Sequence, residues 1–203
     1  MIRWRFAMLA TRWEPWLIAA TISLLLVLLH SDGPIATPLQ VSALLLGAGT
    51  GFAIDDPAAE TLASSPTTLR RRHGVRLAAM GIATALAGLV LGLLARPTGV
   101  DEAVALVAMT AGLVGLNLGV AGVAGRISGW RHGGLVSSPV VLILIIASSM
   151  LPPAWRPLPT GDIPGGWSAI STRWALACVA GLLVLVYSLR DPARRPIVPR
   201  RGP

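Results

Sequence analysis

The stretch IDDPAAETLASSPTTLRRRHGVR, residues Ile54–Arg76, is the longest polar interruption in an otherwise apolar chain. It contains three of the nine acidic residues and four of the seventeen basic ones. The apolar runs on either side of it have the length of membrane-spanning helices. The stretch therefore separates two membrane helices, and we expect it to be a loop that carries a short helix of its own.

The composition also indicates an integral membrane protein. Of the 203 residues, 54% are hydrophobic and 13% are charged, about half the charged fraction of a typical soluble domain. All seventeen basic residues are arginine, and they lie at the ends of apolar runs, where they set topology rather than bind nucleic acid. The single cysteine, Cys178, excludes a disulfide or a cysteine-based metal site within one chain.

Six apolar runs approach the length of about 20 residues that a spanning helix needs. They cover residues 13–30, 38–54, 75–95, 102–124, 135–151 and 172–189. We therefore expect an all-α integral membrane protein whose six-helix domain occupies residues 14–190. The two longer connections are the polar loop 55–74 and a proline-rich loop 152–171.

The two ends of the chain differ from these runs. Arginines alternate with large apolar residues over residues 1–13, which predicts an amphipathic helix lying in the membrane interface. The run that follows ends without a small-residue cleavage site, so we expect it to be retained as a membrane segment. Residues 191–203 are basic and proline-rich, and we expect a disordered tail.

The arginines predict an orientation. Fourteen of the seventeen fall on one side of the six-span arrangement, and only Arg96, Arg156 and Arg173 fall on the other. By the positive-inside rule, the side with fourteen faces the cytoplasm. Both termini and loop 55–74 would then be cytoplasmic, and loop 152–171 would be external. We expect a multi-pass protein of a bacterial plasma membrane.

Polar residues are scarce inside the predicted spans. Asn117, near the middle of the fourth span, is a candidate for an interhelical hydrogen bond or for a pathway residue. The histidines His30, His73 and His132 do not cluster in sequence, so an intramembrane enzyme or a metal site is not expected.

Small residues recur at the spacing that lets helices pack closely. The pairs Gly47–Gly51, Gly88–Gly92 and Gly115–Gly119 each have the GxxxG pattern. The pattern is compatible with ordinary helix packing and with a mobile or dimer-forming face.

The polar loop has the signals of a short helix. Asp56 can cap free backbone N–H groups, and Pro57 suits the first helical position. Residues 58–63 favour helix, and Ser64, Ser65 and Pro66 stop it. A helix this short is unstable alone in water, so we expect a partner or the bundle to hold it.

The segment DDPAAETLASSPTTLRRR resembles the intracellular loop after the second helix in actinobacterial permeases of the ABC-2 exporter type. The predicted six spans, amphipathic first helix and inner termini are also similar to that family. The resemblance implies that Pro57–Ser64 is a coupling helix that docks on a separate ATP-binding subunit. The residues it implicates in coupling are Asp55, Asp56, Pro57, Glu60, Leu62 and Ser64.

The resemblance further implies that residues 1–13 are a connecting helix and that residues 152–171 are an external re-entrant element. The chain would do no chemistry itself, because it lacks lysine and therefore any P-loop, so ATP and Mg²⁺ would bind to the partner subunit. A second copy or a homologous membrane subunit would complete the pathway. The pathway and packing candidates are Asn117, Gly115, Gly119, Gly88 and Gly92.

One alternative stays open at this point. The small size and the GxxxG faces also suit an accessory or assembly subunit of a larger complex, without a pathway of its own. The sequence leaves the substrate, the choice between homodimer and heterodimer, and the direction of transport undetermined, and it does not show whether Asn117 faces a pathway.

Overall fold

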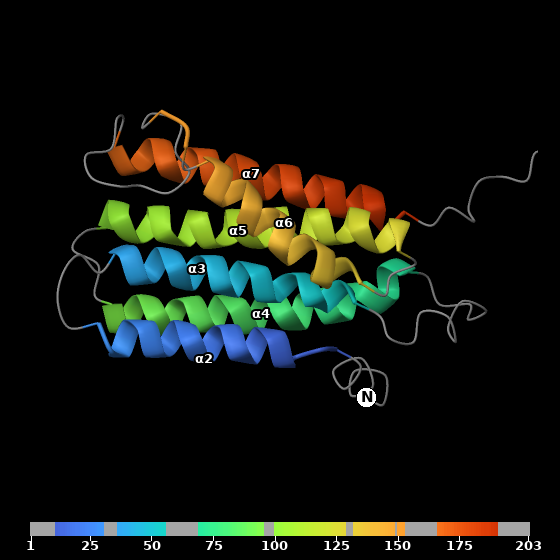
Figure 1. The fold of residues 1–203 in the computed structure, drawn as a ribbon, viewed down its shortest axis with the longest axis horizontal. Coiled ribbons are helices and arrows are strands. Elements are labelled where there is room, and N and C mark those ends of the chain that lie inside the picture. Colours follow the sequence, from blue (N-terminus) through green and yellow to red (C-terminus); the bar gives the residue numbers. More distant parts are fainter. Residues whose placement is uncertain are drawn as a thin grey trace, which may run out of the picture.

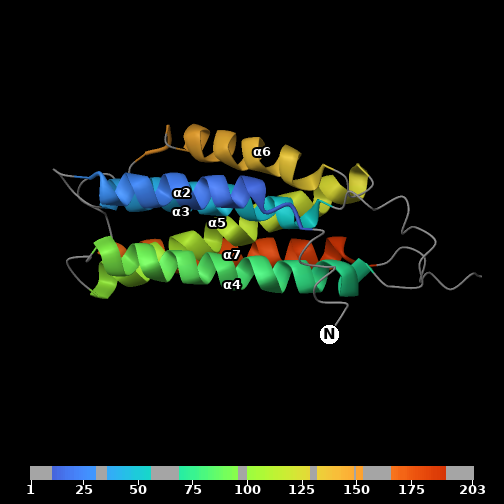
Figure 2. The same cartoon turned by 90° about the horizontal axis from the view of Figure 1, so that it is seen from below.

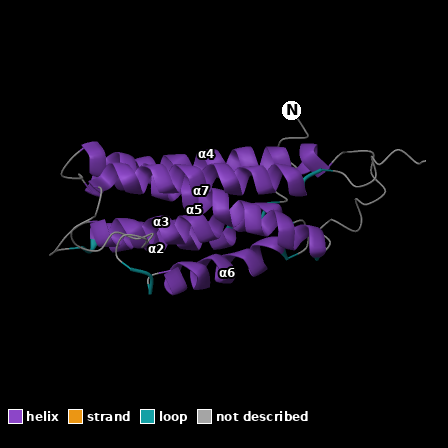
Figure 3. Cartoon of the chain, turned by 90° about the horizontal axis from the view of Figure 1, so that it is seen from above, coloured by secondary structure: helices purple, strands orange, loops and turns teal. Residues whose placement is uncertain are grey.

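The computed structural model describes residues 11–30, 36–55, 69–95, 100–128, 132–148, 150–152 and 166–190. Within these ranges all regular structure is helical and no strand occurs (Figure 3), so the all-α prediction is confirmed. The elements are α2 (Glu14–Leu28), α3 (Ala36–Thr50), the 3-10 turn η1 (Gly51–Ile54), α4 (Leu69–Ala95), α5 (Val100–Ile127), α6 (Gly133–Ser148) and α7 (Gly166–Ser188).

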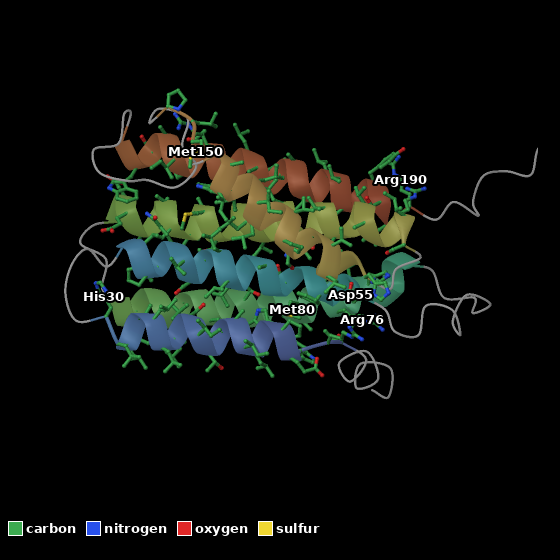
Figure 4. The ribbon with its side chains drawn as sticks, viewed as in Figure 1. His30, Asp55, Arg76, Met80, Met150 and Arg190 are labelled. Atoms are coloured by element: carbon green, nitrogen blue, oxygen red, sulfur yellow. The ribbon has the colours of Figure 1, made fainter. Side chains whose placement is uncertain are left out.

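The helices lie side by side in a bundle (Figure 1). α5 is the central helix and contacts α3, α6 and α7, whereas α4 packs mainly on α2 and α3. Seen from below, α6 lies on the outer side of α2 and α3, and α4 and α7 lie on the opposite side of the bundle (Figure 2). His30 and Met150 lie toward one end, and Asp55, Arg76 and Arg190 lie at the other (Figure 4). We call these the His30 end and the Asp55 end.

Three of these helices are long and apolar enough to cross a membrane, over His73–Leu94, Asp101–Ile127 and Gly166–Ser188. The other three apolar helices are shorter. The bundle exposes large apolar side chains on its outside, which are 69% exposed at Leu93 and 70% exposed at Val107. An outer surface of this kind suits contact with lipid rather than water. These properties fit a membrane protein.

Local sequence explains where the helices begin. Glu14 and a proline occupy the first turn of α2, and Asp101 and Glu102 occupy the first turn of α5. Acidic side chains there interact favourably with the positive end of the helix dipole, and proline there loses no hydrogen bond.

Two helices begin earlier than expected. α4 begins at Leu69, inside the predicted loop 55–74, and α7 begins at Gly166, inside the predicted loop 152–171. Loop 55–74 was assigned from its polarity and loop 152–171 from its prolines, yet the leucine and arginines of residues 69–72 are good helix formers. Residues 56–68 and 153–165 of the two loops lie outside the described residues. The same holds for the predicted interfacial helix apart from residues 11–13, and for the predicted tail.

α5 and α7 form the closest helix pair of the described structure. A Cβ atom added to Gly115 would lie 2.8 Å from the Cα atom of Cys178, and one added to Gly119 would lie 2.7 Å from the carbonyl oxygen of Gly181. A Cβ atom does not come this close to a non-bonded heavy atom, so any side chain at these glycines would force the helices apart. The GxxxG pair of α5 is therefore an internal packing face.

Polar contacts join α2 to its neighbours. Trp16 Nε1 donates a hydrogen bond to Thr84 Oγ1 of α4 at 2.9 Å. The hydroxyl groups of Ser23 and Ser42 each donate to the other residue's carbonyl oxygen at 3.4 Å. These bonds fix α2 against α3 and α4 where packing alone would allow sliding.

We predict that Gly115→Val destabilises the protein by about 1–3 kcal/mol, because the new side chain overpacks the α5–α7 contact. The matched control is Gly88→Ala on α4, where an added Cβ meets no atom within 4 Å. Alanine is favoured over glycine in a helix interior, so this control is expected to be neutral or stabilising. Thermal unfolding of the purified variants in detergent measures both, and an equal loss in the two variants would contradict the packing assignment.

Candidate functional site

The root of the polar loop is held inside the bundle. Asp55 directly follows η1 and is only 1% exposed. Its carboxylate oxygen Oδ1 accepts a hydrogen bond from the backbone N–H of Gly134 at 2.7 Å, and its backbone carbonyl accepts one from Arg76 Nη1 at 3.2 Å. Asp55 therefore joins the end of α3 to the start of α6 and to α4 (Figure 4).

Glycine at the start of α6 makes this contact possible. A Cβ atom on Gly134 would lie 2.6 Å from the backbone nitrogen of Phe52 in η1. The first N–H groups of a helix have no partner within the helix, and a carboxylate that binds them also meets the positive end of the helix dipole. The Asp55 side chain thus caps α6 from a different part of the chain.

The electrostatic environment of Asp55 is mixed. Burial raises the pKa of its carboxyl group, and the hydrogen bond from Gly134 is the largest of the influences that oppose the rise. The positive charges of Arg12 and His132 and a hydrogen bond from Gly133 lower the pKa further. Oδ2 is buried and has no hydrogen-bond partner in the described structure. A buried carboxylate oxygen without a partner makes ionisation of Asp55 costly.

Asn117 of α5 binds carbonyl groups at the end of α3. It is fully buried, and its Nδ2 donates to the carbonyl oxygens of Gly47 at 2.7 Å and Ala48 at 2.9 Å. Ser138 Oγ also donates to the Ala48 carbonyl, at 2.8 Å. The last four carbonyl groups of a helix lack an intrahelical partner, and in α3 they begin at Gly47. Asn117 and Ser138 supply donors that water would supply at an exposed helix end.

These contacts form one site, which we call the polar junction. It consists of the α3 carbonyl groups, the side chains that bind them, and the Asp55 contacts with α4 and α6. Its members are Gly47, Ala48, Asp55, Arg76, Asn117, Gly134 and Ser138.

The candidate residues from the sequence lie in different parts of the structure. Asp55 and Asn117 lie in the polar junction, and Gly115 and Gly119 lie in the α5–α7 contact. Gly88 and Gly92 pack against no helix of the described structure. The remaining coupling candidates lie outside the described residues: Asp56, Pro57, Glu60, Leu62 and Ser64.

Sequence reasoning missed Arg76, Gly134 and Ser138 as functional candidates. Arg76 was assigned only to topology, and Gly134 and Ser138 were given no role. The available signal was a pair of glycines directly before an apolar run, because it marks a helix start that another backbone can approach closely.

Within the described ranges, no three His, Cys, Asp or Glu residues gather in a way that could hold a metal ion. The polar junction can bind a proton at Asp55. It also links helices mechanically.

We predict that Asp55 makes the stability of the protein depend on pH. Its folded pKa lies above the ordinary value of 3.8, so its contribution is fully present below that value. The contribution is lost as the pH rises through the folded pKa. Asp55→Asn keeps an oxygen for the Gly134 N–H but cannot ionise, so its stability advantage over the wild type is expected to grow as the pH rises from about 4 to 8.

Melting temperatures of the two proteins across this pH range measure the effect. Asp55→Ala is the companion variant, because it leaves the Gly134 N–H without its acceptor and is expected to cost about 1–3 kcal/mol. Parallel pH profiles for wild type and Asp55→Asn would show that ionisation of Asp55 does not oppose folding.

The chain matches no known protein-family model, no curated protein and no solved structure.

Proposed function

We propose that the chain is the membrane-spanning subunit of an ATP-driven exporter of the ABC-2 type, in a bacterial plasma membrane. It would cross the membrane six times, with both termini in the cytoplasm. An ATP-binding subunit would supply ATP and Mg²⁺ chemistry, and a second membrane subunit would complete the pathway. The observation that supports this proposal most is that Asp55, at the root of the loop, is hydrogen-bonded to two helices.

The polar junction gives the loop a mechanical connection to the bundle. Residues 56–68 connect Asp55 to Leu69, the first residue of α4. A partner that displaced this segment would act on η1 and α4 directly and on α6 through the Gly134 hydrogen bond. The close α5–α7 pair would respond as one unit, because the two backbones are in direct contact at Gly115 and Gly119. Such coupled shifts of packed helices are a known form of switching transition.

The distribution of charge supports a cytoplasmic Asp55 end. Arg12 acts on Asp55, and Arg76 is bonded to it. On the same end, the guanidinium groups of Arg126 and Arg190 lie 5.8 Å and 5.7 Å from the ring centre of Tyr187. Arginines collect on the cytoplasmic side of membrane proteins, so this end is the one that an ATP-binding subunit would reach.

We predict that the loop is reached only from the cytoplasm. In a Cys178→Ser background, Ser64→Cys is expected to resist a membrane-impermeant maleimide in intact cells and to react after permeabilisation. Thr160→Cys, in the predicted external loop, is the matched control and is expected to react in intact cells. Reaction of Ser64→Cys from outside would refute the topology and with it the exporter proposal.

We predict that the loop and its root have separable roles. A tagged chain purified from its native membrane is expected to bring down a P-loop ATPase, and Glu60→Arg with Leu62→Asp is expected to abolish this association. Asp55→Ala is expected to keep the association but to lose most of the substrate-stimulated ATPase activity, because the loop is then detached from α6. A complex whose pathway is lined only by other chains would instead identify an accessory subunit.

A further inference from the structure

A separate cavity lies in the half of the bundle nearer the His30 end. Its volume is about 660 Å³, and it lies between α4 and α5, with α3 and α7 behind. α4 lines it from Gly81 to Leu93, and α5 lines it from Ala103 to Gly115. At 1.5 Å per residue, the α4 wall is about 18 Å long. Lipid tails of one leaflet cover a similar depth, about 15 Å, half of a hydrocarbon core about 30 Å thick.

Glycines of α4 create this space. Gly81, Gly88 and Gly92 line the cavity, and a Cβ atom at any of them would meet no atom within 4 Å. The α5 glycines are different, because α7 fills the space in front of them. Glycine inside a helix destabilises it relative to alanine, and here no neighbouring helix of the described structure uses the space. The wall therefore leaves room for something that the described part of the chain does not fill.

The mostly apolar lining of the cavity favours an apolar occupant. Its three hydroxyl-bearing residues are Ser42, Thr84 and Thr110, and each hydroxyl is already engaged. Ser42 donates to the carbonyl of Ser23, Thr84 accepts from Trp16, and Thr110 donates to the carbonyl of Leu106. The lining contains no charged residue. A polar ligand would lose its hydrogen bonds to water and find few in return, because only the remaining capacity of these three hydroxyl groups is available.

The mouth of the cavity opens toward the apolar outside of the bundle. Leu89, Leu93 and Val107 belong to the lining and are also 59%, 69% and 70% exposed. A cavity with such a rim is reached from surrounding hydrocarbon and not from water.

We propose that this cavity binds one acyl chain of a membrane phospholipid, which enters sideways from the leaflet at the His30 end. The length of the wall, the engaged hydroxyl groups and the apolar mouth each select a hydrocarbon chain. The site belongs to this chain alone and does not depend on an ATP-binding partner.

The test uses the purified full-length chain in nanodiscs that contain phosphatidylcholine with a photoactivatable diazirine in the middle of one acyl chain. After irradiation, mass spectrometry of peptides maps the labelled residues. Labelling is expected to concentrate on residues 81–93 and 103–115, at least five-fold above the exposed leucines of α2, which serve as the reference: Leu24, Leu25, Leu26 and Leu28.

Paired variants decide whether the cavity is the cause. Gly88→Leu with Gly92→Leu places two side chains in the space, starting from positions where an added Cβ meets no atom within 4 Å, and is expected to reduce the cavity labelling at least five-fold. Gly74→Leu is the matched control, because Gly74 also lies on α4 with no atom within 4 Å of an added Cβ but does not line the cavity. It is expected to leave the labelling unchanged.

Several results would overturn the proposal. Even labelling of α2 and the cavity walls would show that the lipid contacts the surface only, as would labelling that the double variant leaves unchanged. Cross-links from the α4 wall to a second copy of the chain would show that a helix occupies the space. If the double variant fails to fold, as judged by gel filtration, the wild-type map alone decides between concentrated and even labelling. Because no ATPase is present, the outcome is independent of whether the exporter proposal holds.

Discussion

α3 ends inside the bundle, where its last carbonyl groups must find hydrogen-bond donors without water. An unsatisfied backbone group in an apolar environment costs several kcal/mol, which is why irregular backbone within membranes occurs only where protein surrounds it. Asn117 and Ser138 provide the donors, and Asp55 uses the turn that follows to reach α6. Together with Thr50 Oγ1, which also donates to the Gly47 carbonyl at 2.6 Å, these contacts tie the end of α3 to α5 and α6.

The closest helix contact separates two apolar spaces. The larger cavity lies beside α4, and a second one of about 510 Å³ lies between α5, α6 and α7, lined by Leu116, Val136 and Val184. The two occupy opposite halves of α5, on either side of the glycine contact with α7. The α5–α7 pair thus acts as a common wall, and α4 and α6 are the helices whose positions set the sizes of the two spaces.

The helices could be predicted from the sequence more clearly than the contacts between them. Each of the six apolar runs overlaps one α-helix of the described structure, because apolar length is a local property. The GxxxG pattern is equally local, yet Gly115 and Gly119 meet α7 whereas Gly88 and Gly92 meet open space. Spacing along one helix carries no information about what stands opposite it, so the two pairs could not be told apart in advance.

The polar junction shows the same limit. The acidity of Asp55 and the polarity of Asn117 were visible, but their partners lie 79 and 70 residues away in the sequence. Arg76 was closer and was still missed, because its charge had a sufficient explanation in topology. Residues whose role is to satisfy another segment's backbone leave no pattern of their own, and the three-dimensional arrangement is needed to identify them.

The long sequence separations within the junction also set an order of events during synthesis. Asn117 and Ser138 follow their α3 partners by 70 and 90 residues. At translation rates of about 5–20 residues per second, α3 exists for about 4 to 18 s before these donors are made. During that interval the carbonyl groups of Gly47 and Ala48 lack the side-chain donors that α5 and α6 supply in the folded bundle.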